Sequence, residues 1–260
     1  MGGLAGETFV TAPDGVRLWT VADGDGPLTV LLSNGGAGCG DYLAPLAALL
    51  ASDGRRIVRW EQRGVGRSGG DPGGPFTITQ CVADMEAIRA CHGCERWVVS
   101  GHSWGADLSL IYALAHPGRC AGLLAVAGGR LNNDREWHAA YDQGRREGRE
   151  VAPEDDPPLN LAENQQLNAD YKRYVQRPTL FRQVAALDLP ALFLYGAEDI
   201  RPAWAVAQVA ALMPRARFVL LPGADHYPYR THPDEVHAHV DAYLSSLPAQ
   251  DFSARGNGRS

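Results

Sequence analysis

The sequence is short of lysine and of long apolar segments, and each shortage excludes a class of protein. Lys172 is the only lysine among the 24 basic residues of the 260-residue chain. Schiff-base enzymes and P-loop phosphate sites both depend on a lysine in a special setting, and no glycine-rich loop lies beside Lys172. The longest apolar runs stay well below the ~20 residues that a membrane-spanning helix needs. We therefore expect neither lysine-dependent catalysis nor a membrane association.

Positive charge and cysteine are scarce as well. The net charge is -6 at pH 7, whereas a nucleic-acid-binding surface is normally basic, so no nucleic-acid partner is expected. Five cysteines are an odd number for a disulfide framework, and the first residues carry no export signal, which favours a cytoplasmic location. Cys91 and Cys94 form a CxxC pair, but no second pair completes a zinc site, so we expect no bound metal.

What the sequence does contain is an alternation of short apolar runs and amphipathic segments. The apolar runs have the length and character of strands in a parallel sheet that is buried on both faces. A helix is predicted after Thr77, and two others over residues 104–116 and 231–247. The predicted strands are 7–11, 16–21, 28–32, 56–60, 96–100, 122–126, 191–195 and 217–221. The alternation predicts an α/β fold with a mostly parallel central sheet and helices on both faces.

One stretch interrupts this alternation and divides the chain. Residues 130–178 are polar and contain two helical pieces, 134–147 and 161–174, without a clear strand. We interpret them as a short, mainly helical cap insertion over the carboxyl edge of the sheet, where ligands bind in open α/β folds. The predicted division is therefore a core of residues 1–129 and 179–247, a cap or lid of residues 130–178, and a flexible tail of residues 248–260.

The strongest motif is Gly101-His-Ser-Trp-Gly105, which follows a predicted strand and precedes a predicted helix. This is the setting of a nucleophile elbow, in which the serine lies on a strained turn and only glycine fits two residues before and after it. Ser103 is therefore the candidate nucleophile. We expect the neighbouring His102 to point away from the serine and to pack in the core.

A serine nucleophile needs a base, and the base needs an orienting acid. In this strand-turn-helix setting the acid follows the serine along the chain, and the histidine comes last. Asp199 lies in the loop after the strand 191–195 and is preferred to its neighbour Glu198 because it fits a Gly-x-x-Asp turn. His226 lies in the loop before the last helix, whereas the other histidines apart from His102 lie on helices or at their ends. We assign Asp199 as the acid and His226 as the base.

The loop after the third strand is a candidate oxyanion hole. Such a hole needs two backbone N–H groups, one of them from the residue after the nucleophile, here Trp104. The second is expected from the glycine-rich loop 33–38, with Gly36 preferred to Gly35. A GxGxxG sequence at 64–69 is followed by Gly-Asp-Pro instead of a helix, so we predict no nucleotide cofactor.

Three motifs together resemble one family: Asn34-Gly-Gly-Ala-Gly38, Trp60-Glu-Gln-Arg-Gly-Val-Gly-Arg-Ser68 and Gly101-His-Ser-Trp-Gly-Ala106. They are similar to the α/β-hydrolase fold superfamily, and within it to the proline iminopeptidase-like branch of serine hydrolases. The resemblance implies the same triad of Ser103, Asp199 and His226, and a segment 61–68 that braces the oxyanion loop. Dehalogenases and epoxide hydrolases of this fold use an aspartate nucleophile, which the serine at position 103 excludes.

The chain also departs from the proline iminopeptidase pattern. Those enzymes usually have His-Gly-Gly-Pro-Gly where residues 34–38 are Asn-Gly-Gly-Ala-Gly, and their longer cap binds the substrate amine with acidic side chains. Here acidic and basic side chains of the cap nearly balance. We therefore predict a cofactor-independent serine hydrolase that forms an acyl-enzyme with a small ester, lactone, thioester or amide. The alternatives are a proline iminopeptidase-like aminopeptidase and a non-hydrolytic protein of this fold, either a lyase or cyclase or a ligand receptor. The oligomeric state is left open.

Overall fold

A computed structural model describes residues 6–52, 54–71, 73–132, 134–150, 157 and 159–247 of the chain. Eight strands form one sheet, and all eight coincide with predicted ones. Their bounds are β1 Gly6–Thr11, β2 Arg17–Asp23, β3 Leu28–Ser33, β4 Arg55–Trp60, β5 Trp97–His102, β6 Cys120–Val126, β7 Ala191–Gly196 and β8 Ala216–Leu221. The predicted tail 248–260 lies outside the described residues.

The sheet is mostly parallel. Its strand order is β1-β2-β4-β3-β5-β6-β7-β8. The two pairs that involve β2 are antiparallel, and the remaining neighbours run parallel to one another. The central strands β5, β6 and β7 are buried along their whole length, because helices cover both faces of the sheet.

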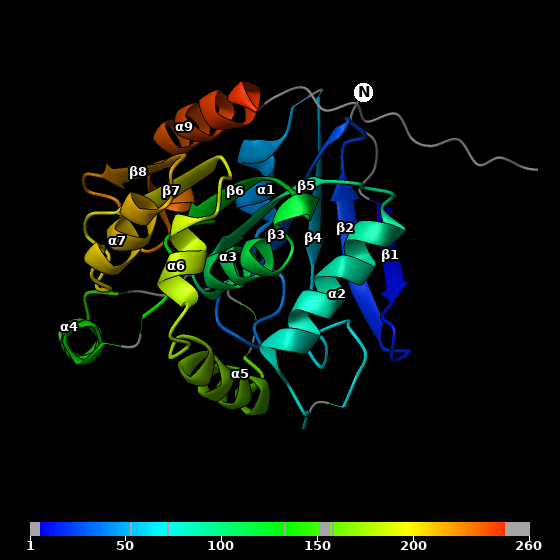
Figure 1. The fold of residues 1–260 in the computed structure, drawn as a ribbon, viewed down its shortest axis with the longest axis horizontal. Coiled ribbons are helices and arrows are strands. Elements are labelled where there is room, and N and C mark those ends of the chain that lie inside the picture. Colours follow the sequence, from blue (N-terminus) through cyan, green and yellow to red (C-terminus); the bar gives the residue numbers. More distant parts are fainter. Residues whose placement is uncertain are drawn as a thin grey trace, which may run out of the picture.

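Helices lie on both faces of the sheet, as predicted (Figure 1). One hydrophobic cluster joins the sheet to α2, α3, α6 and α7, and a second joins its other face to α1, α8 and α9. The bounds are α1 Ala44–Leu50, α2 Ile78–Cys91, α3 Trp104–Ala115, α4 Arg135–Arg146, α5 Leu161–Tyr174, α6 Leu180–Ala185, α7 Trp204–Leu212, α8 Pro228–Thr231 and α9 Pro233–Ser246, with a 3-10 turn at Pro117–Arg119. Within the described ranges, no helix has the length and apolar character needed to cross a membrane.

Side-chain caps explain where several of these helices begin. The Thr77 side chain accepts a hydrogen bond from the Gln80 N–H and starts α2. Asp134 and Asn160 cap α4 and α5 in the same way, which places both helices where the polar periodicity predicts them. By contrast, α1 and α7 are short and almost entirely apolar. Their sequences therefore show no periodic change between polar and apolar residues from which a helix could be predicted.

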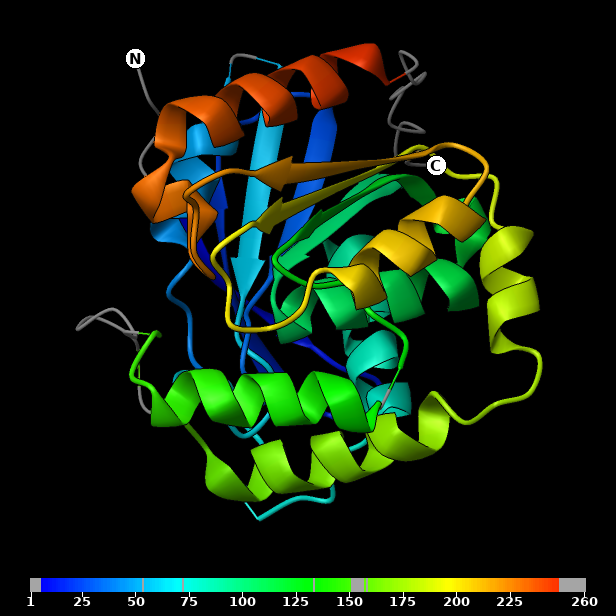
Figure 2. The ribbon, with the colours of Figure 1, turned by 90° about the vertical axis from the view of Figure 1, so that its left-hand side faces the viewer.

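The two helices α4 and α5 lie beyond the carboxyl ends of the parallel strands (Figure 2). The residues around the start of α5 are joined to the loop after β3. The Asn160 N–H donates to the Gly38 carbonyl at 2.8 Å, and Asn164 Nδ2 donates to the Ala37 carbonyl at 3.0 Å. The insertion therefore touches the loop that was predicted to form the oxyanion hole, whereas the division of the chain into core and cap stays a prediction.

Candidate active site

The register of the sheet brings several predicted site residues to one edge. Ser33 at the end of β3 pairs with Gly101 of β5, and His102 pairs with Val126 at the end of β6. Gly196 at the end of β7 pairs with Leu221 at the end of β8. Since these strands are parallel and end level with one another, the loops that follow them meet at the same edge. Those loops carry Gly36, Ser103, Asp199 and His226.

Ser103 lies on a strained turn between β5 and α3. Its backbone has φ 54° and ψ -121°, a conformation that few residues other than glycine adopt. The flanking glycines are required by space. A Cβ at Gly101 would lie 2.4 Å from the Gly105 carbonyl oxygen, and a Cβ at Gly105 would overlap the Ser33 carbonyl oxygen. The local geometry is that of a nucleophile elbow, for the steric reason expected from the sequence.

Asp199 and His226 are in direct contact. His226 Nδ1 lies 2.6 Å from Asp199 Oδ2, and both side chains are buried. The other carboxylate oxygen of Asp199 accepts hydrogen bonds from the backbone N–H of Arg201 at 2.9 Å and from its Nη1 at 3.2 Å. Burial by itself would raise the pKa of Asp199, but His226 and Arg201 outweigh it and hold that pKa below its usual value. Glu198, the competing acid, is exposed to solvent.

The loop that carries His226 is fixed on both sides. Asp225 Oδ1 accepts the Tyr227 N–H at 2.8 Å, and the Thr231 hydroxyl also lies within hydrogen-bond distance of Asp225. Among the residues that the structure describes, no hydrogen bond joins the Ser103 hydroxyl to His226. Asp199 and His226 are thus in contact. Ser103 lies on the turn after β5, and its hydroxyl has no direct hydrogen bond to His226 in the described part of the chain.

The oxyanion candidates separate into one occupied and two available N–H groups. The Gly35 N–H donates to the Tyr42 hydroxyl at 2.8 Å. Gly36 has φ +58° and donates no backbone hydrogen bond within the described ranges. Trp104 is the first residue of α3, where a helix leaves its N–H groups without intrahelical acceptors. Gly36 and Trp104 line the same cavity as Ser103, which favours Gly36 over Gly35.

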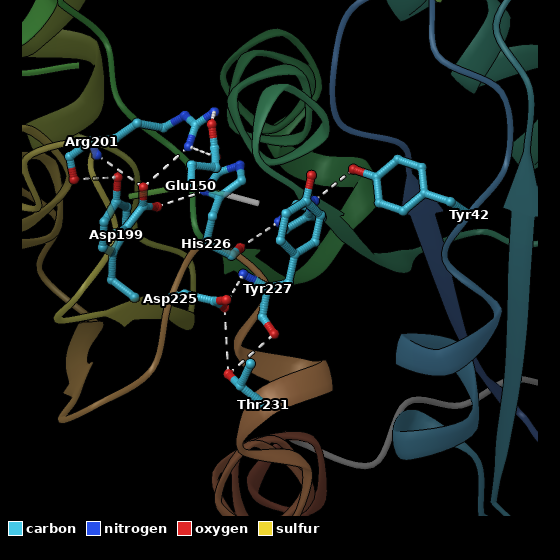
Figure 3. A network of polar contacts seen from close by, with 10 residues as sticks. Tyr42, Glu150, Asp199, Arg201, Asp225, His226, Tyr227 and Thr231 are labelled. Atoms are coloured by element: carbon cyan, nitrogen blue, oxygen red, sulfur yellow. Dashed lines mark hydrogen bonds and ion pairs between the residues drawn. The ribbon is translucent and has the colours of Figure 1, made fainter. Parts of the chain in front are cut away.

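A hydrogen-bonded chain that the sequence reasoning missed links three of these loops. The Tyr42 hydroxyl lies 2.6 Å from His102 Nδ1, and His102 Nε2 lies 2.7 Å from the His226 carbonyl oxygen. A carbonyl only accepts, so His102 carries its proton on Nε2 and the Tyr42 hydroxyl donates to Nδ1. In Figure 3, His226 lies between Tyr42 on one side and the Asp199 group on the other. His102 is buried as predicted, but it is also hydrogen-bonded through both ring nitrogens.

A cavity of about 320 Å³ opens next to Ser103. Aromatic and polar side chains from α3, from the polar stretch after β6, and from β7 and its following loop surround it. They are Trp104, Asp107, Arg130, Trp137, His138, Tyr141, Asn164, Asn168, Tyr195 and Arg201. A space of this size accommodates a small organic group next to the serine.

Glu150, from the polar stretch after β6, is linked to Asp199 through Arg201. Arg201 Nη1 forms ion pairs with both Glu150 and Asp199. Glu150, Asp199 and His226 offer possible metal-ligand atoms within 4.8 Å of one another. The carboxylates of Glu150 and Asp199 both pair with the Arg201 guanidinium, which supplies the positive charge between them (Figure 3).

The resemblance implies that the segment 61–68 braces the oxyanion loop. Glu61 Oε1 accepts the Asp41 N–H at 3.2 Å, and the Asn34 side chain donates to the Trp60 carbonyl at 2.7 Å. These two bonds join the loop after β3 to the end of β4 and the residue that follows it. Arg63 forms two hydrogen bonds with buried Asp84 and so joins the segment to α2.

Comparison with known proteins agrees with this geometry. The family described as "alpha/beta hydrolase fold" matches residues 29–155. Epoxide hydrolase B of Mycobacterium tuberculosis is 35% identical over 118 residues, covering 44% of this chain and 33% of that protein. A proline iminopeptidase of Xylella fastidiosa is 39% identical over 94 residues, covering 35% of this chain and 28% of that protein. The matched segments thus span about a third of the length of these curated relatives.

A structural comparison extends the likeness over nearly the whole chain. The crystal structure of proline iminopeptidase from Mycobacterium smegmatis superposes with a TM-score of 0.70 at 21% identity, covering 92% of this chain and 98% of the other. At that identity the superposition shows a shared fold. Together with the matched family and the local sequence identity, it shows that the chain has the α/β-hydrolase fold and is similar to proline iminopeptidases.

Proposed function

We propose that the protein is a cofactor-independent serine hydrolase that forms an acyl-enzyme on Ser103. The observation that carries the proposal is the surroundings of Ser103. The serine lies on a strained turn beside a cavity that Gly36 and Trp104 also line, and the bonded pair Asp199–His226 lies in the loops after β7 and β8, at the same edge of the sheet. Nucleophile, base, orienting acid and oxyanion donors are the parts that acyl transfer requires.

The proposed steps follow from these roles. His226 Nε2 takes the proton of the Ser103 hydroxyl while the serine oxygen attacks the substrate carbonyl, and the Gly36 and Trp104 N–H groups bind the oxyanion. The proton then passes from His226 to the leaving alcohol, thiol or amine. Water loses a proton to His226 and attacks the acyl-enzyme, which releases the acid and regenerates the serine. The bond between serine and base is often long in a free hydrolase and tightens with substrate, in line with its absence here.

For the substrate, we propose a small ester, lactone, thioester or amide. A proline iminopeptidase-like aminopeptidase is the second candidate, favoured by the names of the relatives above. An aminopeptidase must bind a free amine close to the serine. Among the charged side chains that line the cavity within the described residues, only Asp107 is acidic, and Arg130 lies beside it. That lining favours the first candidate.

Turnover of two chromogenic substrates tests the proposal. A para-nitrophenyl ester of a short acid and a prolyl para-nitroanilide are each incubated with the wild-type protein and with Ser103→Ala. We expect ester turnover that falls by a factor on the order of 10⁶ in kcat in the variant. Prolyl release that also depends on Ser103 would favour the aminopeptidase. Ester turnover that persists in folded Ser103→Ala would contradict the mechanism, and a folded wild type that turns over neither substrate would favour a non-hydrolytic role.

A further inference from the structure

One wall of the cavity beside Ser103 is built around Arg130. This residue follows β6, and a buried carboxylate on α3 holds its backbone in place. Asp107 Oδ1 accepts the Gly129 N–H at 2.7 Å and the Arg130 N–H at 3.0 Å. Arg130 and Ser103 line the same cavity. The turn that carries Arg130 is therefore tied directly to the helix that begins at the serine.

The Arg130 guanidinium is oriented but keeps hydrogen-bonding capacity. It stacks on the Trp137 ring at 3.9 Å, and its Nη1 donates to the Asn132 carbonyl at 2.9 Å. Its Nε lies 3.8 Å from Asp107 Oδ2, which is an ion-pair distance too long for a hydrogen bond. Within the described part of the chain, Nε and Nη2 donate no hydrogen bond. A fixed arginine with free N–H groups is suited to a planar, two-oxygen anion.

Because of the state of the other charged groups around the cavity, Arg130 is the main source of positive electrostatic potential there. Arg201 is already paired with Glu150 and Asp199. Burial raises the pKa of Asp107 to about 6, so this carboxylate is still mostly ionised at pH 7 and offsets part of the charge of Arg130. Burial lowers the pKa of His138, and Arg130 and Lys172 lower it further, which favours the neutral imidazole. The unpaired hydrogen-bonding capacity of positive character in the cavity lining is therefore that of the Arg130 guanidinium.

We propose that the acyl group of the substrate carries a carboxylate, and that Arg130 binds it while Ser103 attacks the acyl carbonyl. This inference rests on the proposed function and narrows its substrate class to half-esters, or related acyl derivatives, of short dicarboxylic acids. A neutral acyl chain would cover the free N–H groups of Arg130 without replacing their hydrogen bonds to water, which is costly. Arg130 thereby becomes a specificity residue, and an amine next to it is disfavoured.

Matched substrates test the proposal. The para-nitrophenyl half-ester of adipic acid is compared with the para-nitrophenyl ester of hexanoic acid, after subtraction of spontaneous hydrolysis. The two differ in a terminal carboxylate in place of a methyl group. We expect kcat/KM of the wild type to favour the half-ester by about 10- to 100-fold, the effect of one charged hydrogen-bonded contact. Equal values, or a preference for the neutral ester, would overturn the proposal.

Two substitutions assign the preference to Arg130. Arg130→Met keeps a long side chain that can lie on Trp137, and it should remove the preference, chiefly by lowering kcat/KM for the half-ester. Arg177→Met is the matched control, because Arg177 also stacks on an aromatic ring, Tyr174 at 4.5 Å, but does not line this cavity. It should leave both rates unchanged. Equal loss on both substrates in folded Arg130→Met would show a structural role for Arg130 and contradict the proposal.

A binding measurement separates this inference from the proposed function. Calorimetric titration of folded Ser103→Ala with monomethyl adipate and with methyl hexanoate needs no turnover, and the two ligands differ in a terminal carboxylate in place of a methyl group. Tighter binding of monomethyl adipate, lost when Arg130→Met is added, supports the carboxylate site even if the wild type hydrolyses no ester, in which case only the hydrolase proposal fails. Ester hydrolysis that depends on Ser103, with monomethyl adipate bound no better than methyl hexanoate, leaves the hydrolase in place and overturns the carboxylate site.

Discussion

The Asp199 carboxylate is shared between an imidazole and a guanidinium. One oxygen bonds to His226 Nδ1, and the other accepts two hydrogen bonds from Arg201. An arginine so close would compete with the histidine for the carboxylate, but Arg201 is itself paired with Glu150. The carboxylate is thereby left to orient the imidazole and to stabilise it when it gains a proton. Asp199 is thus held by Arg201 of its own loop and by His226 of the loop after β8.

From this arrangement we expect turnover to depend on Asp199 and not on Glu198. Asp199→Asn should lower kcat by a factor on the order of 10⁴, because an amide can donate to His226 Nδ1 and stabilise the wrong tautomer. Glu198→Gln is the control, since Glu198 is exposed one residue away, and it should change kcat by less than about 2-fold. Steady-state kinetics with a para-nitrophenyl ester measures both. Near-normal turnover in Asp199→Asn would show that another residue orients the base.

Sequence reasoning finds residues whose role depends on a local turn and misses those that act across the fold. Ser103, Asp199 and His226 each follow a strand in a recognisable loop. Tyr42 and His102 are 60 residues apart, and His102 and His226 are 124 apart, so their contacts have no local signature. Arg130 looks like one of many charged residues of a polar stretch until the structure places it beside the serine.

At the scale of elements, three loops from different strands are tied together under the candidate site. The Gly35 N–H, the Tyr42 hydroxyl, the His102 ring and the His226 carbonyl form one continuous chain of hydrogen bonds. It runs from the oxyanion loop after β3, through the elbow after β5, to the loop after β8. Since every member is buried or nearly so, removing one leaves its partners unsatisfied in the interior. Tyr42 and His102 are therefore positioning residues.

Removal of the Tyr42 hydroxyl should lower kcat without a comparable change in KM. In Tyr42→Phe the Gly35 N–H loses its acceptor and His102 its donor, so the oxyanion loop and the base both lose a restraint. We expect a fall in kcat of about 10-fold, equivalent to roughly 1.4 kcal/mol, and a change in KM of less than about 2-fold.

The control for this prediction is Tyr243→Phe, whose hydroxyl donates to the Pro190 carbonyl at 3.0 Å, away from the site. Both variants should lose stability in thermal unfolding, but only Tyr42→Phe should lose turnover. An equal kcat in the two variants would mean that the hydrogen-bonded chain serves folding alone.

The elements themselves were predictable to different degrees. The central strands β5, β6 and β7 follow from continuous apolar runs, because a strand buried on both faces has no polar side to interrupt it. β1 is mostly exposed, and its prediction rests on a short β-like run. α2, α4 and α5 follow from capping residues and from polar periodicity. α1 and α7 are missing from the prediction because a short, uniformly apolar helix has the same composition as a buried strand.

At the scale of the whole molecule, α5 is attached to the core through a buried acid. Glu163 in its first turn is completely buried, and neither carboxylate oxygen has a hydrogen-bond partner in the structure. A Cβ at Gly38 of the oxyanion loop would lie 3.2 Å from the Glu163 Cβ, so the two segments pack closely. Burial raises the pKa of Glu163 to about 8, and the nearby carboxylate of Asp84 adds to the effect.

The buried acid should make folding stability fall as pH rises. Between its ordinary pKa of about 4.3 and its folded pKa, the unfolded chain has lost this proton and the folded chain keeps it, so unfolding becomes easier with rising pH and the effect levels off above the folded pKa. Glu163→Gln removes the titration. The free energy of unfolding of Glu163→Gln minus that of the wild type should therefore be at least about 1 kcal/mol larger at pH 8 than at pH 5.

Denaturant unfolding of both proteins at a series of pH values measures this difference. Glu235→Gln is the control, since Glu235 is exposed on α9, and its stability should follow that of the wild type at every pH. A constant difference between Glu163→Gln and the wild type across this range would contradict the buried, protonated state of Glu163.

The most direct test of the central claim is covalent labelling of Ser103. The wild type and Ser103→Ala are treated with diethyl para-nitrophenyl phosphate, which phosphorylates an activated serine whatever acyl group the cavity prefers. Intact-mass and peptide analysis should find one diethylphosphoryl group per chain, on Ser103, with none in the folded variant. Equal labelling of the two proteins, or a folded wild type that takes up no label, would contradict an activated serine at position 103.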